Sequence, residues 1–279
     1  MQYRTDLAIE REEILSDSDK KGVLVKKWNK DNADITLVEI LDEEGEKNIG
    51  KPKGKYYTIK VPEFSHETEL LDGRLTAITE IIKDLLPTSK GLILVAGVGN
   101  DNITPDALGP LCAEQIFVTR HIESVLNDDF LTPDLRPVSS ISTGVLGQTG
   151  LEAAEYIKAI ADSIKPDAVI VVDALASKGI SHLGKTVQLS DTGISPGSGV
   201  GNYRKKIDID YLGVPVIAIG VPTVVDGKSI NETLEETENM IVTPSDIDSI
   251  IQRASKLLAL SINCALHRNV EPQLLLSLM

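Results

Sequence analysis

The apolar residues of the chain fall into three nearly continuous runs, separated by stretches in which they recur with helical spacing. The runs cover 91–98, 168–172 and 214–221. Runs of this kind are typical of central strands in a parallel sheet that is covered on both faces. Helical spacing occupies four further segments: 65–82, 110–124, 151–164 and 243–262. This alternation predicts an α/β fold, a three-layer α/β/α sandwich with a mostly parallel central sheet.

The N-terminal quarter has a different pattern. Short strand-like segments at 22–26, 35–40 and 56–61 follow one another with turn-rich pieces between them and no helical spacing. They predict a small antiparallel β subdomain near the N-terminus, an appendage at 22–62 within a single domain. Residues 1–20 are polar and acidic, with a short helix expected at 7–15. Minor strands are expected at 138–141 and, on an edge, at 186–189.

Composition narrows the class of protein. The 279 residues are 42% hydrophobic and carry a net charge of −14, from 42 acidic and 28 basic side chains. This balance disfavours a nucleic-acid interface and docking on anionic membranes. We find no stretch of the ~20 apolar residues that a membrane span requires and no signal peptide. Cys112 and Cys264 lie far apart, which suits a reducing compartment. We expect a soluble cytoplasmic protein.

Two aspartates mark the candidate site. Asp106 follows the first apolar run, in Thr104–Gly109, and Asp173 directly follows the second. Ligand sites of parallel sheets lie beyond the carboxyl ends of the strands, so the two carboxylates are a candidate acid/base or metal-binding pair. Asp106 could instead complement the dipole at a helix start, and Asp173 could cap a turn. An acid after five apolar residues is costly to bury unless it is paired, hydrogen-bonded or coordinating.

The loop 191–202 contains an Asp-Thr-Gly triplet and several glycines. The triplet is the catalytic signature of pepsin-like proteases, but those are β-rich proteins that need two copies. Glycines in 193–202 could cradle a phosphate, which would make the chain a phosphate- or nucleotide-binding small-molecule enzyme. Their spacing matches neither the P-loop nor GxGxxG. The four histidines show no HExxH spacing and there is no GxSxG, so classical zinc and serine hydrolase chemistry is not indicated.

A collinear series of motifs carries a resemblance. In chain order these are Asn100 with TPDALGP (104–110), VTRH (118–121), RPV (136–138), GVLG (144–147), VDALA (172–176), SDTGI (190–194), PGSGVGN (196–202) and VPVIAIGVPTVVD (214–226). The series closely resembles the germination protease of spore-forming bacteria, an endopeptidase that initiates degradation of small acid-soluble spore proteins. It covers nearly the whole chain.

The resemblance implies a fold like that of hydrogenase maturation proteases, a homotetramer, synthesis as a zymogen and a place in the forespore and spore core. The two essential aspartates of the family match Asp106 and Asp173. Further candidates for the site are Asp191, Asn100, Gly144, Gly197 and Gly199. The family is classed with unusual aspartic peptidases, whereas relatives of the same fold bind metal at the equivalent places. A divalent metal at Asp106 and Asp173 is therefore left open. A spore protein that keeps the fold without catalysis is a third interpretation, which the intact pair disfavours.

The resemblance also makes the N-terminus interpretable. The family removes a leader at a site where an acidic residue precedes an apolar one and then Ala. Thr5-Asp6-Leu7-Ala8 fits, so we expect cleavage between Asp6 and Leu7, with a propeptide at 1–6 and the peptidase domain at 7–279. This leader is shorter than in the best-known members. Ser195 stands where the family has His, so His chemistry is not expected from that loop.

Overall fold

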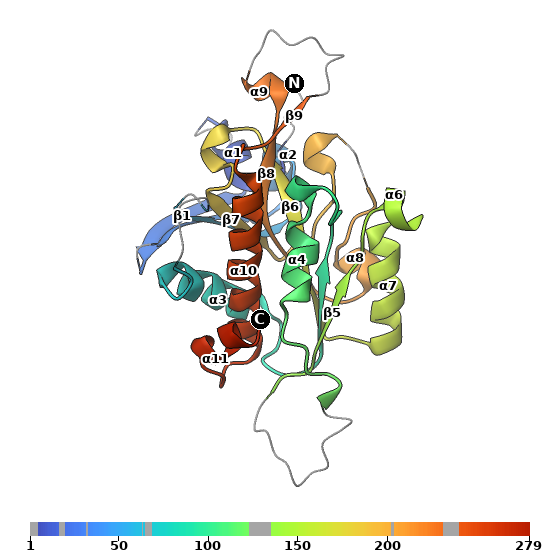
Figure 1. Cartoon of the computed structure of the whole chain (residues 1–279). Coiled ribbons are helices and arrows are strands. Elements are labelled where there is room, and N and C mark those ends of the chain that lie inside the picture. Colours follow the sequence, from blue (N-terminus) through green and yellow to red (C-terminus); the bar gives the residue numbers. More distant parts are fainter. Residues whose placement is uncertain are drawn as a thin grey trace.

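The strands of the chain form one continuous sheet (Figure 1). The computed structural model describes residues 5–16, 20–31, 33–62, 64, 69–122, 135–201, 204–230 and 240–279. Within these residues the sheet has nine strands in the order β1-β2-β3-β7-β8-β6-β4-β5, with β9 paired to β8. They are β1 (Val23–Lys30), β2 (Ala33–Ile40), β3 (Gly54–Lys60), β4 (Ile93–Gly97), β5 (Val138–Ser142), β6 (Ala168–Ser177), β7 (Thr186–Ser190), β8 (Val216–Asp226) and β9 (Ile241–Val242).

The sheet has a parallel half and an antiparallel half. Strands β8, β6, β4 and β5 pair in parallel, as the three apolar runs predicted. Strands β1, β2 and β3 are antiparallel, as predicted for 22–62, and they extend the same sheet because β3 pairs with β7. The prediction that β7 is an edge strand is wrong, since β7 lies between β3 and β8. A strand of five residues gives no sequence signal for such long-range pairing on both sides.

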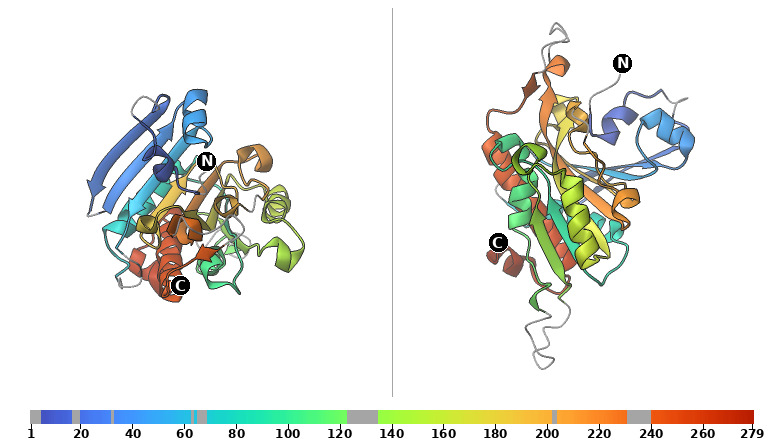
Figure 2. Two further views of the ribbon diagram at one scale, coloured as in Figure 1. Left: turned by 90° about the horizontal axis from the view of Figure 1, so that it is seen from above. Right: turned by 90° about the vertical axis from the view of Figure 1, so that its right-hand side faces the viewer.

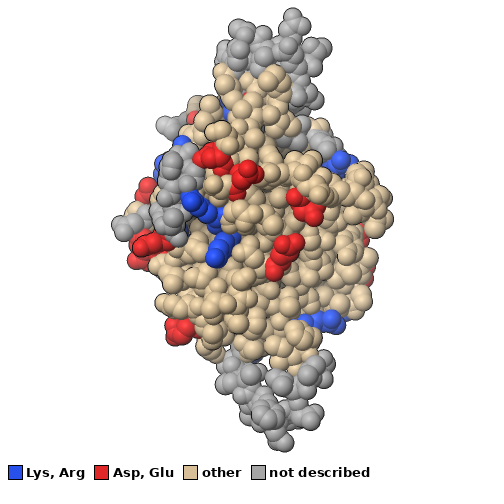
Figure 3. All heavy atoms as spheres, viewed as in Figure 1, with Lys and Arg blue, Asp and Glu red and all other residues tan. Residues whose placement is uncertain are grey.

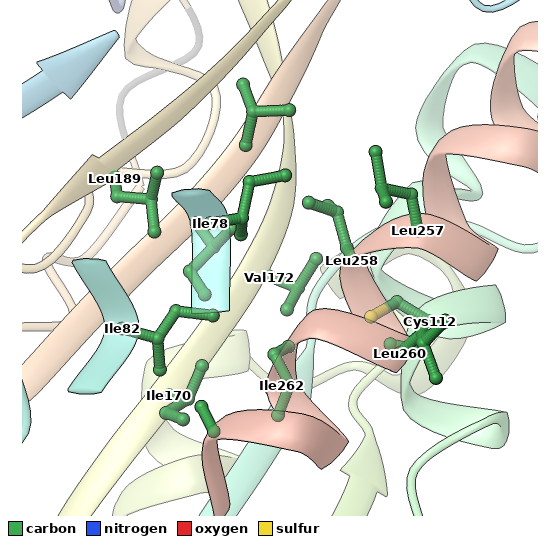
Figure 4. Close-up of a cluster of buried hydrophobic side chains, with 14 of the residues drawn as sticks. Ile78, Ile82, Cys112, Ile170, Val172, Leu189, Leu257, Leu258, Leu260 and Ile262 are labelled. Atoms are coloured by element: carbon green, nitrogen blue, oxygen red, sulfur yellow. The ribbon is translucent and has the colours of Figure 1, made fainter. Parts of the chain in front are cut away.

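Helices cover both faces of the sheet, which confirms the three-layer fold. Because side chains alternate along a strand, Ile170 and Val172 of β6 face one helical layer and Val169 and Val171 face the other. The first layer is α3 (Gly73–Leu85), α4 (Leu108–Glu114) and α10 (Ile247–Leu266), and the second is α7 (Ala153–Ile164) and α8 (Ile209–Leu212). Figure 2 shows the two layers on opposite sides of the sheet, and Figure 4 shows Ile170 and Val172 against α10.

Two predicted helices differ in length from those observed. Helix α4 ends at Glu114, well before 124, because polar contacts take over its orphan backbone groups. Asn263 of α10 accepts a hydrogen bond from Phe117 N (2.9 Å) and donates one to Gln115 O (3.0 Å). Helix α3 starts only at Gly73, where the carboxylate of Asp72 caps it. Residues 65–68 and 123–124 of the predicted helices lie outside the described residues.

The remaining elements are short. The predicted N-terminal helix is confirmed as α1, whereas α2 was not predicted, although Asp42 caps it and acidic residues fill its first turn. These elements are α1 (Ala8–Glu12), α2 (Glu43–Ile49), α6 (Leu146–Thr149), α9 (Gly227–Ile230), α11 (Pro272–Ser277) and the 3₁₀ turns η2 (Thr104–Asp106), η3 (Ile180–His182) and η4 (Ser198–Val200).

The charged residues of the face that α10 and α4 cover are scattered. Figure 3 shows acidic and basic side chains lying separately over this face rather than gathered into a basic patch. Among the described residues, no helix combines the length and the apolar character that crossing a bilayer demands.

Candidate active site

Asp173 lies inside β6, four residues before the strand ends at Ser177. The sequence run predicted a strand that stops at Val172, but the segment 173–177 continues to pair with β8. Because side chains alternate along β6, Asp173 lies on the same face of the sheet as Val171 and Leu175. Val171 belongs to the apolar cluster under α7, and Leu175 packs with Leu7 and Ile9. The side chain is 4% exposed. Asp173 is therefore a buried acid within a central strand of the sheet.

Asp106 ends the 3₁₀ turn η2 that follows β4. Its Oδ2 accepts a hydrogen bond from the backbone N–H of Asn100 (2.8 Å), and its own N–H donates to Ile103 O (2.8 Å). The residue completes a closed loop rather than capping α4, which begins at Leu108. The loop 100–106 thus holds the carboxylate through the main chain.

Glycines bring this loop against β6. A Cβ on Gly109, at the start of α4, would overlap the carbonyl oxygens of Val98 and Val172. A Cβ on Gly99, which has φ of +132°, would overlap the carbonyl oxygen of Asp106. The backbones pack directly on one another here, and only glycine permits that approach. Val172 O accepts the Val98 N–H at 2.8 Å, so the two strand ends are joined next to Asp173.

The pKa values of both carboxyl groups are raised, and the charge of Asp106 contributes to the shift of Asp173. Burial raises the pKa of Asp106 to about 6, although the hydrogen bond from Asn100 N–H favours its ionised form. Burial also raises the pKa of Asp173 well above its ordinary value, and the negative charges of Asp106 and Asp6 raise it further. Near neutral pH the arrangement therefore favours an ionised Asp106 beside a protonated Asp173.

A third carboxylate, that of Asp6, reaches the same place from the N-terminus. Asp6 N donates to Ala176 O (2.9 Å), and Ala176 N donates to Asp6 Oδ2 (2.9 Å). The Ser198 hydroxyl donates to Asp6 Oδ1 at 2.7 Å. The expected processing site is thus docked on the last residues of β6, close enough for its charge to raise the pKa of Asp173.

Leu7 is docked as firmly as Asp6. Its side chain is 1% exposed and packs with Ile9 against Leu175 and Ile194. Hydrogen bonds therefore hold Asp6, before the Asp6–Leu7 bond, and apolar contacts hold Leu7, after it. Of the proposed propeptide 1–6, the first four residues lie outside the described part of the chain.

The other predicted site residues lie in two places. Asn100 Oδ1 accepts a hydrogen bond from Gln148 Nε2 (2.6 Å), in the loop that starts at Gly144 with φ of +63°. Gly144 and Gln148 line a groove of about 410 Å³ that reaches Gly99, next to the Asp106 loop. Asp191 is exposed and accepts a hydrogen bond from Lys55 N (2.8 Å), so its contact is with β3 and not with the aspartate pair.

Gly197 and Gly199 belong to the loop that contacts Asp6. Gly197 turns the chain into η4 with φ of +71°, and Gly199 lies against the Asp6 carboxylate. Beside them is a cavity of about 110 Å³ whose lining includes Asp6, Lys51 and Ser198. Burial lowers the pKa of Lys51 to about 8, in spite of the nearby Asp6 carboxylate. Sequence reasoning missed the contacts of Ala176, Ser198 and Lys51, although Ala176 and Ser198 both stand within the motifs of the resemblance.

Comparison with known proteins identifies the family. A family model described as germination protease matches residues 4–236. The chain belongs to this family. Among its relatives, the germination protease of Caldanaerobacter subterraneus subsp. tengcongensis is 41% identical over 95% of this chain and 94% of its own length. That of Clostridium perfringens is 38% identical over 96% of both. Family membership makes the chain a peptidase, hence a hydrolase, of a family named for spore germination.

A solved structure is also similar to this chain. It is the [NiFe] hydrogenase maturation protease HycI from Thermococcus kodakarensis KOD1, which aligns at 22% identity with a TM-score of 0.39. The alignment covers 65% of this chain and 98% of that one.

The side chains that could hold a metal are few. Within the described residues, no group of three or more His, Cys, Asp or Glu side chains is arranged to bind an ion. Asp106 and Asp173 by themselves offer two carboxylates, a set that Mg²⁺ accepts when water completes its shell. Both cysteines are buried, and burial raises the pKa of each thiol, which makes them poor nucleophiles.

Proposed function

We propose that the chain is an endopeptidase that begins the degradation of small acid-soluble spore proteins during germination, with Asp106 and Asp173 as its catalytic pair. The observation that carries the proposal is the docking of Asp6 and Leu7 on the end of β6, within electrostatic reach of Asp173. A segment of polypeptide thus already lies where the substrate of a peptidase would lie. Family membership supports the reaction class.

The unequal pKa values assign different roles to the two acids. Asp106, with a pKa of about 6, is mostly ionised at neutral pH and takes a proton from a water molecule. The water oxygen bonds to the peptide carbon, and the carbonyl π electrons move to the carbonyl oxygen, which becomes an oxyanion. As the carbonyl re-forms, Asp173, still protonated, donates its proton to the departing nitrogen. The carbon–nitrogen bond breaks, and a proton returns from Asp106 to Asp173 through solvent. Backbone N–H groups of loops 144–150 and 193–202 stabilise the oxyanion in this proposal.

The docked N-terminus supports synthesis as a zymogen. The backbone of Asp6 occupies contacts on β6 that a substrate would need, so in this proposal the residues before the Asp6–Leu7 bond exclude substrate until that bond is cut. We propose self-cleavage between Asp6 and Leu7. Assembly as a homotetramer and a place in the spore core complete the proposal and rest on the family resemblance alone.

The alternative function for loop 193–202 is phosphate or nucleotide binding, and the contacts that the loop makes favour another role. Ser198 and Gly199 of this loop contact the carboxylate of the chain's own Asp6. We therefore assign the loop to recognition of the polypeptide.

The test is the intact mass of the purified chain over time, for the unchanged protein beside Asp106→Asn and Asp173→Asn. Loss of residues 1–6 from the unchanged protein, absent in both variants, is the expected result. Cleavage of a purified small acid-soluble spore protein by the processed form tests the substrate. Self-processing that persists in either variant would refute the assignment of the pair.

A further inference from the structure

The Asp106 loop, residues 100–106, has little apolar packing at its tip. Asp101 and Ile103 are exposed there, Ile103 by 53% although it is a large apolar residue. The loop closes on itself through the main chain, because Ile103 N donates to Asn100 O at 3.1 Å and Asp106 N donates to Ile103 O at 2.8 Å. An exposed segment that is held by local hydrogen bonds opens readily, so a contact from outside the loop is needed to fix its tip.

The side-chain amide of Gln148, in α6, makes such a contact. Its Nε2 donates to Asn100 Oδ1 at 2.6 Å and to Asp101 Oδ1 at 3.0 Å. Its Oε1 accepts a hydrogen bond from Val145 N at 3.2 Å. These three bonds fix which end of the amide is nitrogen, because a flipped amide would set its oxygen against two acceptor oxygens. Both hydrogens of the amide are thus engaged within the protein, and neither is left for a substrate.

The segment that carries Gln148 is itself anchored to the sheet. Thr143 is buried, and its N–H donates to Gly97 O, at the end of β4, over 3.0 Å. Gly144 then turns the chain into the loop with φ of +63°. Gln148 therefore connects the exposed tip of the Asp106 loop to the carboxyl ends of β4 and β5.

Asn100 transmits this contact to Asp106. Its side-chain oxygen accepts from Gln148, while its backbone N–H donates to Asp106 Oδ2 at 2.8 Å. The same side-chain oxygen accepts from Asn102 N at 3.0 Å, which keeps Asn100 in one orientation. A shift of Asn100 would break the bond to the carboxylate and let Asp106 move. Misplacing a reacting group by about 1 Å can cost on the order of a hundredfold in rate.

We propose that Gln148 is a positioning residue for cleavage, which holds Asp106 in its catalytic position through Asn100. Gln148 lines the groove of about 410 Å³ beside the Asp106 loop, yet its amide hydrogens are bonded to that loop. Its removal therefore slows the chemical step and leaves the binding of substrate unchanged. The side chain is exposed, so no core packing is lost with it. This inference rests on the proposed function.

Kinetics on a peptide covering residues 3–14 test this role in the self-processed protein. Gln148→Ala should lower kcat about tenfold and change KM less than about twofold, because a positioning contact is lost and no substrate contact is removed. Gln252→Ala, at an exposed position of α10, is the matched control and should change either constant less than about twofold. A raised KM with unchanged kcat would refute the positioning role, and so would two unchanged constants.

A second pair of substitutions distinguishes this contact from a general loss of structure. Gln148→Glu should lower kcat at least about tenfold, since a carboxylate donates no hydrogen bond and is repelled by that of Asp101. Adding Asp101→Asn removes one of the two charges and supplies an amide donor, so kcat should recover about threefold or more. Asp101→Asn alone should change kcat less than about threefold, because its amide oxygen still accepts from Gln148. A double variant as slow as Gln148→Glu would refute the contact.

Hydrogen exchange separates this inference from the proposed function. Exchange of residues 99–107 is measured in the full chain carrying Asp173→Asn, which prevents self-cleavage. Adding Gln148→Ala should speed exchange of this segment about fivefold or more, and adding Gln252→Ala should not. If the unchanged protein cuts no peptide but this difference appears, the proposed function fails and the contact between Gln148 and the loop stands. If exchange is the same in all three proteins, the positioning role is refuted.

Discussion

The backbone N–H of Asn100 donates a hydrogen bond to Asp106 Oδ2 over 2.8 Å. Because the donor belongs to the main chain, no replacement at position 100 other than proline removes it. The bond favours the ionised carboxylate and works against burial, which raises the pKa of Asp106 to about 6. Asp173 has burial and two neighbouring negative charges acting in the same direction, so its pKa is shifted much further. The pair is thus unequal before any substrate arrives.

We expect the pH dependence of cleavage to reflect Asp106 on its acid side. Below about pH 6 the base is protonated, so kcat/KM should fall about tenfold per pH unit, and it should level off above about pH 6 to 7. At higher pH the rate should fall again as Asp173 ionises. The measurement is kcat/KM from about pH 4.5 to pH 9, with circular dichroism at each pH to exclude unfolding. An acid limb centred near pH 4 would contradict the role of Asp106.

Asp173→Asn should abolish activity and stabilise the fold. An acid whose pKa is raised in the folded state keeps a proton that the unfolded chain releases above about pH 4. The unfolded state then binds fewer protons, so the free energy of unfolding of the unchanged protein falls as pH rises. Relative to Asp173→Asn, it should fall by about 1.4 kcal/mol per pH unit for as long as Asp173 stays protonated when folded.

Urea unfolding at about pH 5, 6 and 7 measures this difference between the two proteins. Asp191→Asn, which removes an exposed carboxylate, is the matched control. Stability curves that stay parallel for Asp173→Asn and the unchanged protein would mean that Asp173 is already ionised in the fold.

Gly109→Ala should separate the Asp106 loop from β6. The added Cβ would overlap the carbonyl oxygens of Val98 and Val172, and neither can move without breaking the bond between Val98 N and Val172 O. We expect a loss of about 2–3 kcal/mol in the free energy of unfolding, together with loss of activity. Gly147→Ala, in open space, serves as the control for the substitution itself. A stable, fully active Gly109→Ala protein would show that this backbone contact does not position the site.

Removal of divalent metal should leave activity intact if the two carboxylates act directly on water. The measurement is cleavage after exhaustive chelation and dialysis, with and without Mg²⁺, Mn²⁺ or Zn²⁺ added back. Loss of activity that a single metal restores would transfer the activation of water to an ion bound by Asp106 and Asp173. Unchanged activity would support the direct acid/base mechanism.

The sequence predicts the fold class well because continuous apolar runs and helical spacing of apolar residues both follow from burial, which the residue types record along the chain. It places Asp173 beyond a strand that in fact continues, since the acid interrupts the apolar run and only one large apolar residue, Leu175, follows it before Ser177. The end of α4 is set by Asn263, about 150 residues away, which no local pattern could reveal. Element boundaries of this kind depend on tertiary contacts that override propensity.

The candidate site likewise has one part that the sequence predicts and one part that it does not. Asp106 and Asp173 follow apolar runs, so their convergence could be predicted from strand ends alone. The hydrogen bonds that the carboxylates of Asp6 and Glu10 accept could not be predicted, because three of the four donors that follow β6 or lie at its end and in loop 193–202 are backbone N–H groups, which leave no trace in residue identity. Ser198 is the one donor with a side chain, and in sequence it looks like any serine in a glycine-rich loop.

The difference in length between β4 and β6 also bears on which proteins can be cut. Backbone groups of β6 beyond Val172, where its pairing with β4 stops, can bond only to a segment whose own N–H and C=O groups are unengaged. A helix or a paired strand has none to offer, so a stably folded protein would have to open locally before it could enter. In the proposed function, a strand that is longer than its neighbour therefore selects substrates by their folding state, and it spares compact proteins.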